Sequence, residues 1–249
     1  MKSSRFFTSR NIAFLAVLLA LVIVLQIWAS AIPLGATRIS LTLIPIVLGA
    51  VLLGPAAGAF LGAAFGVVVV VVAVAGGDPF TLTLLSDHPA LTVLLCLVKG
   101  AAAGAAAGLL FRLVRRKNEY AAVFAAALSA PVVNTGLFIL GALLMSDTIG
   151  ENFVADGTTV LYFLVIGCAG LNFAVEFIVN AVASPAIYTV ERLIERRVLK
   201  GKKAAPKKDG DAQSAMPAQS AMPAQSGMPA GDNRPAQGGK RAEVPETKS

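Results

Sequence analysis

The chain has 249 residues, of which 56% are hydrophobic and only 14% are charged. Soluble domains carry about 25% charged residues, so this composition excludes an ordinary soluble globular protein. The formal net charge of +7 could suggest a nucleic-acid partner, but no basic stripe interleaves with aromatic residues as such a surface requires. The basic residues stand beside apolar stretches, where they indicate the topology of a membrane protein.

Six apolar stretches follow one another along the chain. A helix needs roughly 20 residues to cross a hydrocarbon core of about 30 Å. The predicted spans cover residues 11–29, 41–53, 56–75, 90–114 and 120–145, and a sixth runs from about 159, past the membrane surface, to about 199. Gly54-Pro55 separates the second span from the third, and because proline cannot continue the helical hydrogen-bond ladder we expect a tight turn or kink there.

The basic clusters predict how the spans are oriented. Lys2, Arg5 and Arg10 precede the first span, residues 112–117 carry four basic residues after the fourth, and most others follow the sixth. Six spans place all of these clusters on the cytoplasmic side and the acidic loops outside, whereas five or seven spans do not. The sequence therefore predicts an all-α bundle of six transmembrane helices with both termini cytoplasmic.

The composition changes abruptly after the sixth span. Residues 1–200 form the predicted membrane domain, and residues 201–249 form a tail that contains the hexapeptide array AQSAMP, AQSAMP, AQSGMP. Such a tract has too little apolar surface to offset the loss of chain entropy on folding. We expect this tail to be a disordered cytoplasmic segment and assign it no role.

Small residues recur every four positions in two spans. The third span carries such a ridge at 54, 58, 62 and 66, and the fourth carries another at 100, 104 and 108, all glycines. This spacing keeps the small residues on one helix face, so another backbone can approach closely. Ordinary packing inside the bundle is sufficient to explain both ridges.

Among the polar residues of the predicted spans, five are candidates for a shared role, because a charge there must be paired or hydrated. They are Lys99, Asn134, Asn172, Glu176 and Asn180, and the last three share one side of a helix because they are four residues apart. Two interpretations stay open. Lys99 could pair with Glu176 while the asparagines bond across helices, or the same groups could line a cavity that binds a polar solute.

Enzymatic chemistry has no support in the sequence. There is no Gly-x-Ser-x-Gly, no His-Glu-x-x-His and no phosphate-binding glycine loop. Two cysteines, Cys96 and Cys168, lie in apolar runs, and with His88 as the only histidine a zinc site is not expected. We predict neither a metal nor a cofactor.

Several segments resemble the substrate-binding S components of energy-coupling factor (ECF) vitamin transporters. The resemblance covers roughly residues 10–198 and preserves the order of the spans. It rests on IPIVLGAVLLGPAAGAFLG (44–62), VKGAAAG (98–104), APVVNTG (130–136), NFAVEFIVN (172–180) and SPAI (184–187).

The resemblance implies a mechanism and a site. S components capture a vitamin from outside with high affinity and dock on a shared membrane subunit driven by two ATPase subunits. Ala16 and Ala20 match the family's Ala-x-x-x-Ala docking motif on the first helix. The position of the solute in the family makes five residues candidate ligands: Lys99, Asn134, Asn172, Glu176 and, near the lid, Arg38. Asn180 lies deeper and is expected to be structural.

The predicted function is thus the solute-binding subunit of an ECF-type importer. Because Lys99 offers a positive charge, pantothenate is the first candidate solute, followed by folate and riboflavin. Two alternatives stay open: a solitary carrier that needs no ATPase, and a membrane scaffold whose polar residues only hold helices together.

Overall fold

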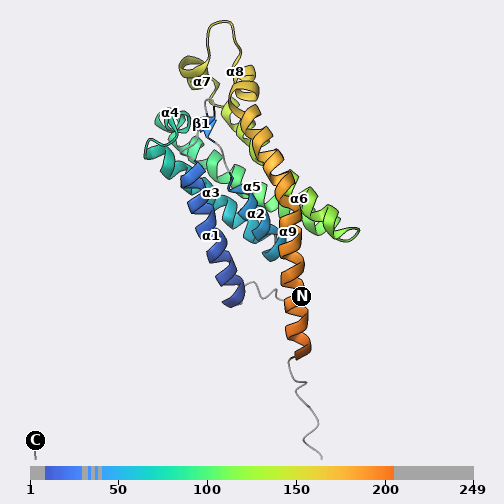
Figure 1. Ribbon diagram of the computed structural model, residues 1–249. Helices are drawn as coiled ribbons and strands as arrows, with labels where there is room; N and C mark the ends of the chain where they lie inside the picture. Colours follow the sequence, from blue (N-terminus) through green and yellow to red (C-terminus); the bar gives the residue numbers. More distant parts are fainter. Residues whose placement is uncertain (1–8, 30–32, 35–36, 39–40, 205–249) are drawn as a thin grey trace, which may run out of the picture. The chain divides into compact units, whose positions relative to one another are not determined.

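The structure is a computed structural model that describes residues 9–29, 33–34, 37–38 and 41–204 (Figure 1). The predicted tail falls outside the described residues from position 205 onward. The described part is helical apart from one short hairpin, in which β1 (Pro33–Leu34) pairs antiparallel with β2 (Thr37–Arg38). This confirms the predicted all-α class of the membrane domain.

Long helices make up the bundle, and shorter helical segments connect or cap them (Figure 1). The long helices are α1 (Ser9–Ala29), α3 (Pro55–Val74), α5 (Pro89–Val114), α6 (Glu119–Leu143) and α9 (Leu171–Ala204). The shorter segments are α2 (Leu43–Leu53), α4 (Pro79–Asp87), α7 (Ser146–Phe153), α8 (Val160–Tyr162) and the π-helical η1 (Phe163–Gly170), which leads into α9.

Five of the six predicted spans are long and apolar enough to cross a membrane: Asn11–Ala29, Pro55–Val74, Pro89–Val114, Glu119–Leu143 and Val160–Ile194. The remaining one, α2, has 11 residues and rises only about 16 Å at 1.5 Å per residue. It ends at Gly54, whose φ of 103° is unfavourable for any residue with a Cβ atom, and Pro55 begins α3. The predicted turn is confirmed, but α2 alone is too short to count as a span.

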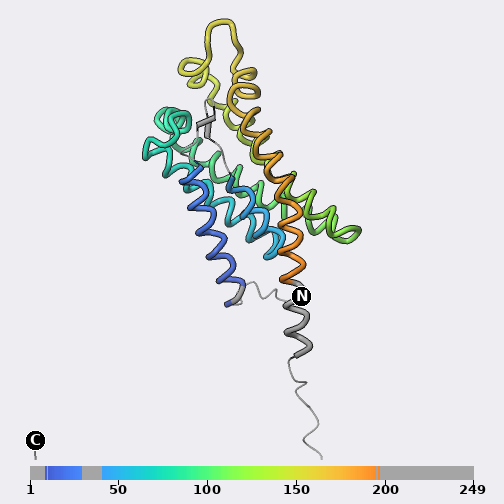
Figure 2. The backbone as a smooth tube through the Cα atoms, in the orientation of Figure 1, coloured from blue at the N-terminus to red at the C-terminus, as the bar shows by residue number. Residues whose placement is uncertain are grey.

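The glycine ridges bring α3 and α5 into backbone contact (Figure 2). Gly58 faces the backbone of Gly104, Gly62 faces that of Gly100, and Gly66 faces that of Cys96, so the two helices run antiparallel. A Cβ atom at any of these three positions would overlap the opposite backbone. The close approach predicted from the four-residue spacing is therefore confirmed.

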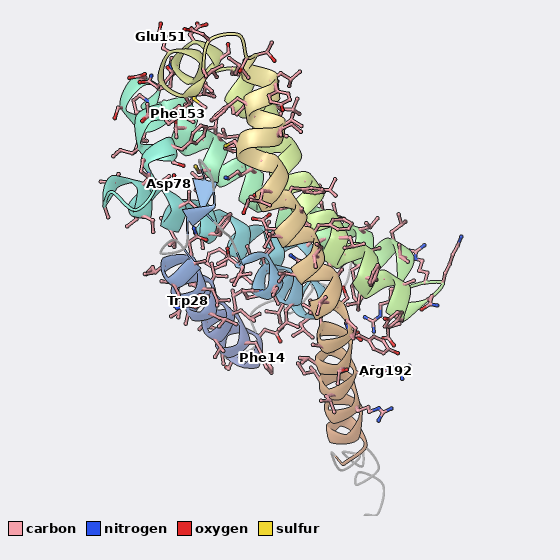
Figure 3. All side chains as sticks on the ribbon, turned by 45° about the horizontal axis from the view of Figure 1, so that its top comes forward. Phe14, Trp28, Asp78, Glu151, Phe153 and Arg192 are labelled. Atoms are coloured by element: carbon pink, nitrogen blue, oxygen red, sulfur yellow. The ribbon has the colours of Figure 1, made fainter. Side chains whose placement is uncertain are left out.

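Ion pairs tie the helices together at the basic end of the bundle. Arg115 lies 3.4 Å from Glu119 and 3.3 Å from Glu191, and Arg192 lies 3.4 Å from Glu119. These contacts join the α5–α6 turn to α9. Figure 3 shows Arg192 toward one end of the bundle and Asp78 and Glu151 toward the other, so these ion pairs lie at the end opposite Asp78 and Glu151.

Removal of Arg115 should therefore destabilise the bundle. In Arg115→Ala, the Glu191 carboxylate, whose side chain is 3% exposed, loses the guanidinium that faces it. We expect a loss of about 1–3 kcal/mol, the usual cost of leaving a buried polar group without its partner. Thermal unfolding in detergent measures the change. Arg116→Ala, which removes an exposed arginine of the same turn, is the control, and equal midpoints for the two variants would contradict the prediction.

Candidate functional site

A cavity of about 70 Å³ lies inside the bundle, on the side that α4 closes. All five long helices contribute residues to its wall, together with α4 and η1. The lining residues are Gln26, Phe65, Val69, Asp78, Phe80, Thr81, Lys99, Asn134, Thr135, Phe138, Cys168, Ala169, Asn172 and Glu176.

Four of the residues predicted to bind solute line this cavity. Lys99 comes from α5, Asn134 from α6, and Asn172 and Glu176 from α9. They are brought together because α5 packs against α6 and α6 against α9. Their convergence is a finding of the structure, whereas their contact with a solute stays a prediction.

The other predicted positions lie elsewhere. Arg38 stands in β2, and its side chain is outside the described set. Asn180 is buried and donates to the Glu176 backbone carbonyl at 2.8 Å, without lining the cavity, and its structural role stays a prediction. Ala16 and Ala20 are exposed on α1, as a docking surface requires.

The carboxylate of Glu176 is the most enclosed polar group of the cavity. The residue is 1% exposed, and its Oε1 accepts a hydrogen bond from Asn172 Nδ2 at 3.0 Å. Its Oε2 has no hydrogen-bond partner among the described residues, and neither have the amide oxygens of Asn134 and Asn172. Buried polar atoms are nearly always bonded in native proteins, so these three acceptors need an explanation.

Lys99 does not pair directly with Glu176. Its Nζ lies 4.9 Å from the centroid of the Phe138 ring, a cation–π contact. Within the described part of the chain, no carboxylate oxygen lies within 4.0 Å of this ammonium group. The sequence left open whether Lys99 pairs with Glu176. The structure does not contain this direct ion pair.

Sequence reasoning missed several lining residues. Gln26 is 6% exposed on α1 and accepts a hydrogen bond from Thr42 at 3.1 Å. Its position as an amide within an apolar span could have identified it as a candidate lining residue. The sequence reasoning also did not include α4, which lies between the third and fourth predicted spans. Asp78 caps that helix by accepting from the Thr81 backbone N–H at 3.3 Å, and Asp-Pro is a typical helix start.

The cavity offers groups that can bind a polar solute. One ammonium and two carboxylates face it, with amides and phenyl rings between them. In the described part of the chain, no cluster of three or more His, Cys, Asp or Glu residues could hold a metal. Ligand sites for drug-sized molecules usually enclose about 300–1,000 Å³, so a solute of that size can enter only if the lining elements move apart.

Five apolar helices long enough to span a membrane, packed around a core that holds a polar cavity, define a multi-pass membrane protein. The comparison with protein families gives the class a name. A family model described as the substrate-specific component of the ECF transporter matches residues 10–188. The chain belongs to this family, as the resemblance predicted, and its members bind and transport solutes and are not enzymes. No curated protein and no solved structure matches the chain.

Proposed function

We propose that this chain captures a vitamin-like solute with high affinity from the outer side of a bacterial plasma membrane. The observation that supports this best is the convergence of Lys99, Asn134, Asn172 and Glu176 on one enclosed cavity. A mere scaffold has no need for three buried acceptors without partners. The solute would then be passed to an ECF coupling subunit and two ATPase subunits, since this chain has no phosphate-binding loop of its own.

The orientation proposed here follows the positive-inside rule. The end that carries Arg115 and Arg192 would face the cytoplasm, and the cavity under α4 would open to the outside. In this proposal the predicted span 41–53, which contains α2, is one of six crossings, and six crossings leave both termini cytoplasmic. Docking on the coupling subunit would use the exposed Ala16 and Ala20 of α1.

The positive charge of Lys99 favours a solute that carries an anionic or electron-rich group. On this basis pantothenate is the first candidate, with folate and riboflavin next. A solitary carrier would have the same cavity but would need no partner, so transport without ATPase subunits would favour it. A scaffold would bind none of the three.

Lys99→Met tests the role of the ammonium group. Methionine keeps much of the length and apolar volume of the lysine stem, while the charge is lost. If Lys99 contacts the solute, binding should weaken at least about tenfold, because hydrogen bonds to charged groups contribute roughly 1.5–3 kcal/mol. Calorimetric titration with riboflavin, folate and pantothenate measures this. Lys117→Met, at an exposed lysine of the basic end, is the control, and an unchanged affinity in folded Lys99→Met removes the role.

A further inference from the structure

Three fully buried polar atoms of the cavity have no hydrogen-bond partner among the described residues, and all three are acceptors. They are Glu176 Oε2, Asn134 Oδ1 and Asn172 Oδ1. Glu176 is 1% exposed and Asn134 is 5% exposed, so bulk water does not reach these side chains freely. The orientation of the Asn172 amide is determined by the bond from its Nδ2 to Glu176 Oε1, which leaves its oxygen as the free atom. What completes this site must donate hydrogen bonds.

The charges of the lining favour the same type of solute. Lys99 supplies one positive charge, whereas Asp78 and Glu176 supply two carboxylates. Asp78 is already engaged by the backbone N–H and hydroxyl of Thr81, but Glu176 has a free oxygen. A simple anion would satisfy Lys99 and add a third negative charge beside acceptors that it cannot satisfy. Lys99 alone is therefore a poor guide to the solute.

Phenyl rings supply the rest of the wall. Phe65, Phe80 and Phe138 line the cavity, and the rings of Phe80 and Phe138 are 6.0 Å apart between centroids. Aromatic faces and edges favour another flat ring over a flexible aliphatic chain. A ring in contact with Phe138 would also lie near the ammonium of Lys99, which is 4.9 Å from that centroid.

We propose that the recognised part of the solute is a planar nitrogen heterocycle whose ring-edge N–H groups donate to Glu176 Oε2 and Asn134 Oδ1. Lys99 then faces an acceptor of the same ring, such as a carbonyl oxygen, and is not the anchor of a carboxylate. This inference rests on the proposed function and narrows it. It ranks folate first, because the edge of its pterin ring carries an N–H and an amino group, and riboflavin second, because its ring carries one N–H. Pantothenate has hydroxyl and amide donors but no ring to pack against the phenyl groups, so it ranks below both.

Glu176→Gln is the variant that separates the two types of solute. Glutamine has nearly the same shape, but one carboxylate oxygen becomes an NH₂ donor that opposes an N–H of the solute. A heterocycle that donates to Glu176 should bind at least about tenfold more weakly. An anion that is anchored by Lys99 and donates nothing to Glu176 should bind as well as before or better, because a like charge is removed.

The experiment uses the full-length chain in mild detergent, with riboflavin, folate and pantothenate titrated separately. We expect riboflavin or folate to bind, with the loss in Glu176→Gln, and pantothenate to bind far more weakly. Glu191→Gln makes the same change at a buried residue of α9 that does not line the cavity and should bind like the wild type. Asn134→Leu, which removes the second acceptor, repeats the test if Glu176→Gln does not fold.

Each outcome bears on the inference. Binding of pantothenate that survives Glu176→Gln overturns it and leaves the proposed function intact. If none of the three binds, the compound released from the denatured protein decides the matter. A nitrogen heterocycle supports the inference and any other solute overturns it. A preparation that neither releases nor binds a solute contradicts the proposed function itself.

Discussion

Gly62→Ala should destabilise the bundle by about 1–3 kcal/mol, although it adds a single methyl group. The new Cβ atom would overlap the carbonyl oxygen and carbon of Gly100 on α5. Those atoms belong to a helix backbone and cannot rotate away like a side chain, so α3 and α5 must separate along their whole contact. Adding a methyl group to a close-packed interior lowers the free energy of unfolding by about 1–3 kcal/mol when the surrounding atoms cannot move aside. The midpoint of thermal unfolding in detergent measures the loss.

Gly136→Ala is the matched control for this change. Gly136 lies within α6, and a Cβ atom there would meet nothing within 4 Å. Alanine is favoured over glycine in a helix by up to about 1 kcal/mol, so this variant should be as stable as the wild type or more so. The account of the glycine ridges fails if both variants unfold at the same temperature.

Leucine at positions 16 and 20 should abolish uptake and leave solute binding intact. Both alanines are exposed on α1, and the cavity wall receives Gln26 but neither alanine from that helix. If the flat surface formed by these alanines receives the coupling subunit, two isobutyl groups would hold the partner's helices apart. We expect uptake to fall at least about tenfold in cells that express the partner subunits, while the affinity in detergent stays within about twofold of the wild type.

Ala186→Leu serves as the control for the double variant, because it places the same side chain at an exposed alanine of α9. It should transport normally. Uptake that persists in Ala16→Leu/Ala20→Leu would contradict docking through this surface. Uptake that also persists without ATPase subunits would favour the solitary carrier.

The elements that depend on local patterns could be predicted from the sequence. Long apolar runs identified the five full spans, and Gly-Pro identified the turn before α3. The four-residue glycine spacing predicted that another backbone approaches these helices closely, because the period of a helix alone determines which residues share a face; that the two ridges meet each other is seen only in the structure. Polar residues inside apolar runs identified Lys99, Asn134, Asn172 and Glu176, since the membrane makes such residues costly wherever they occur.

The features that depend on tertiary geometry could not be predicted. The apolar run before Gly54 resembles a span, but only the backbone shows that α2 starts at Leu43 and is too short. The sequence could not decide whether Lys99 pairs with Glu176, because that depends on side-chain directions across two helices. Phe80 and Thr81 reach the cavity only because α4 folds over it, and no periodicity indicates this.

The most direct test of the proposed function is to purify the full-length protein in mild detergent, denature it, and identify the released small molecule by mass spectrometry. The account predicts a vitamin-sized compound in stoichiometric amount, with a ring that carries N–H groups. A preparation that releases nothing, and whose unfolding temperature does not change with riboflavin, folate, pantothenate or other vitamins, would contradict solute binding and favour a scaffold.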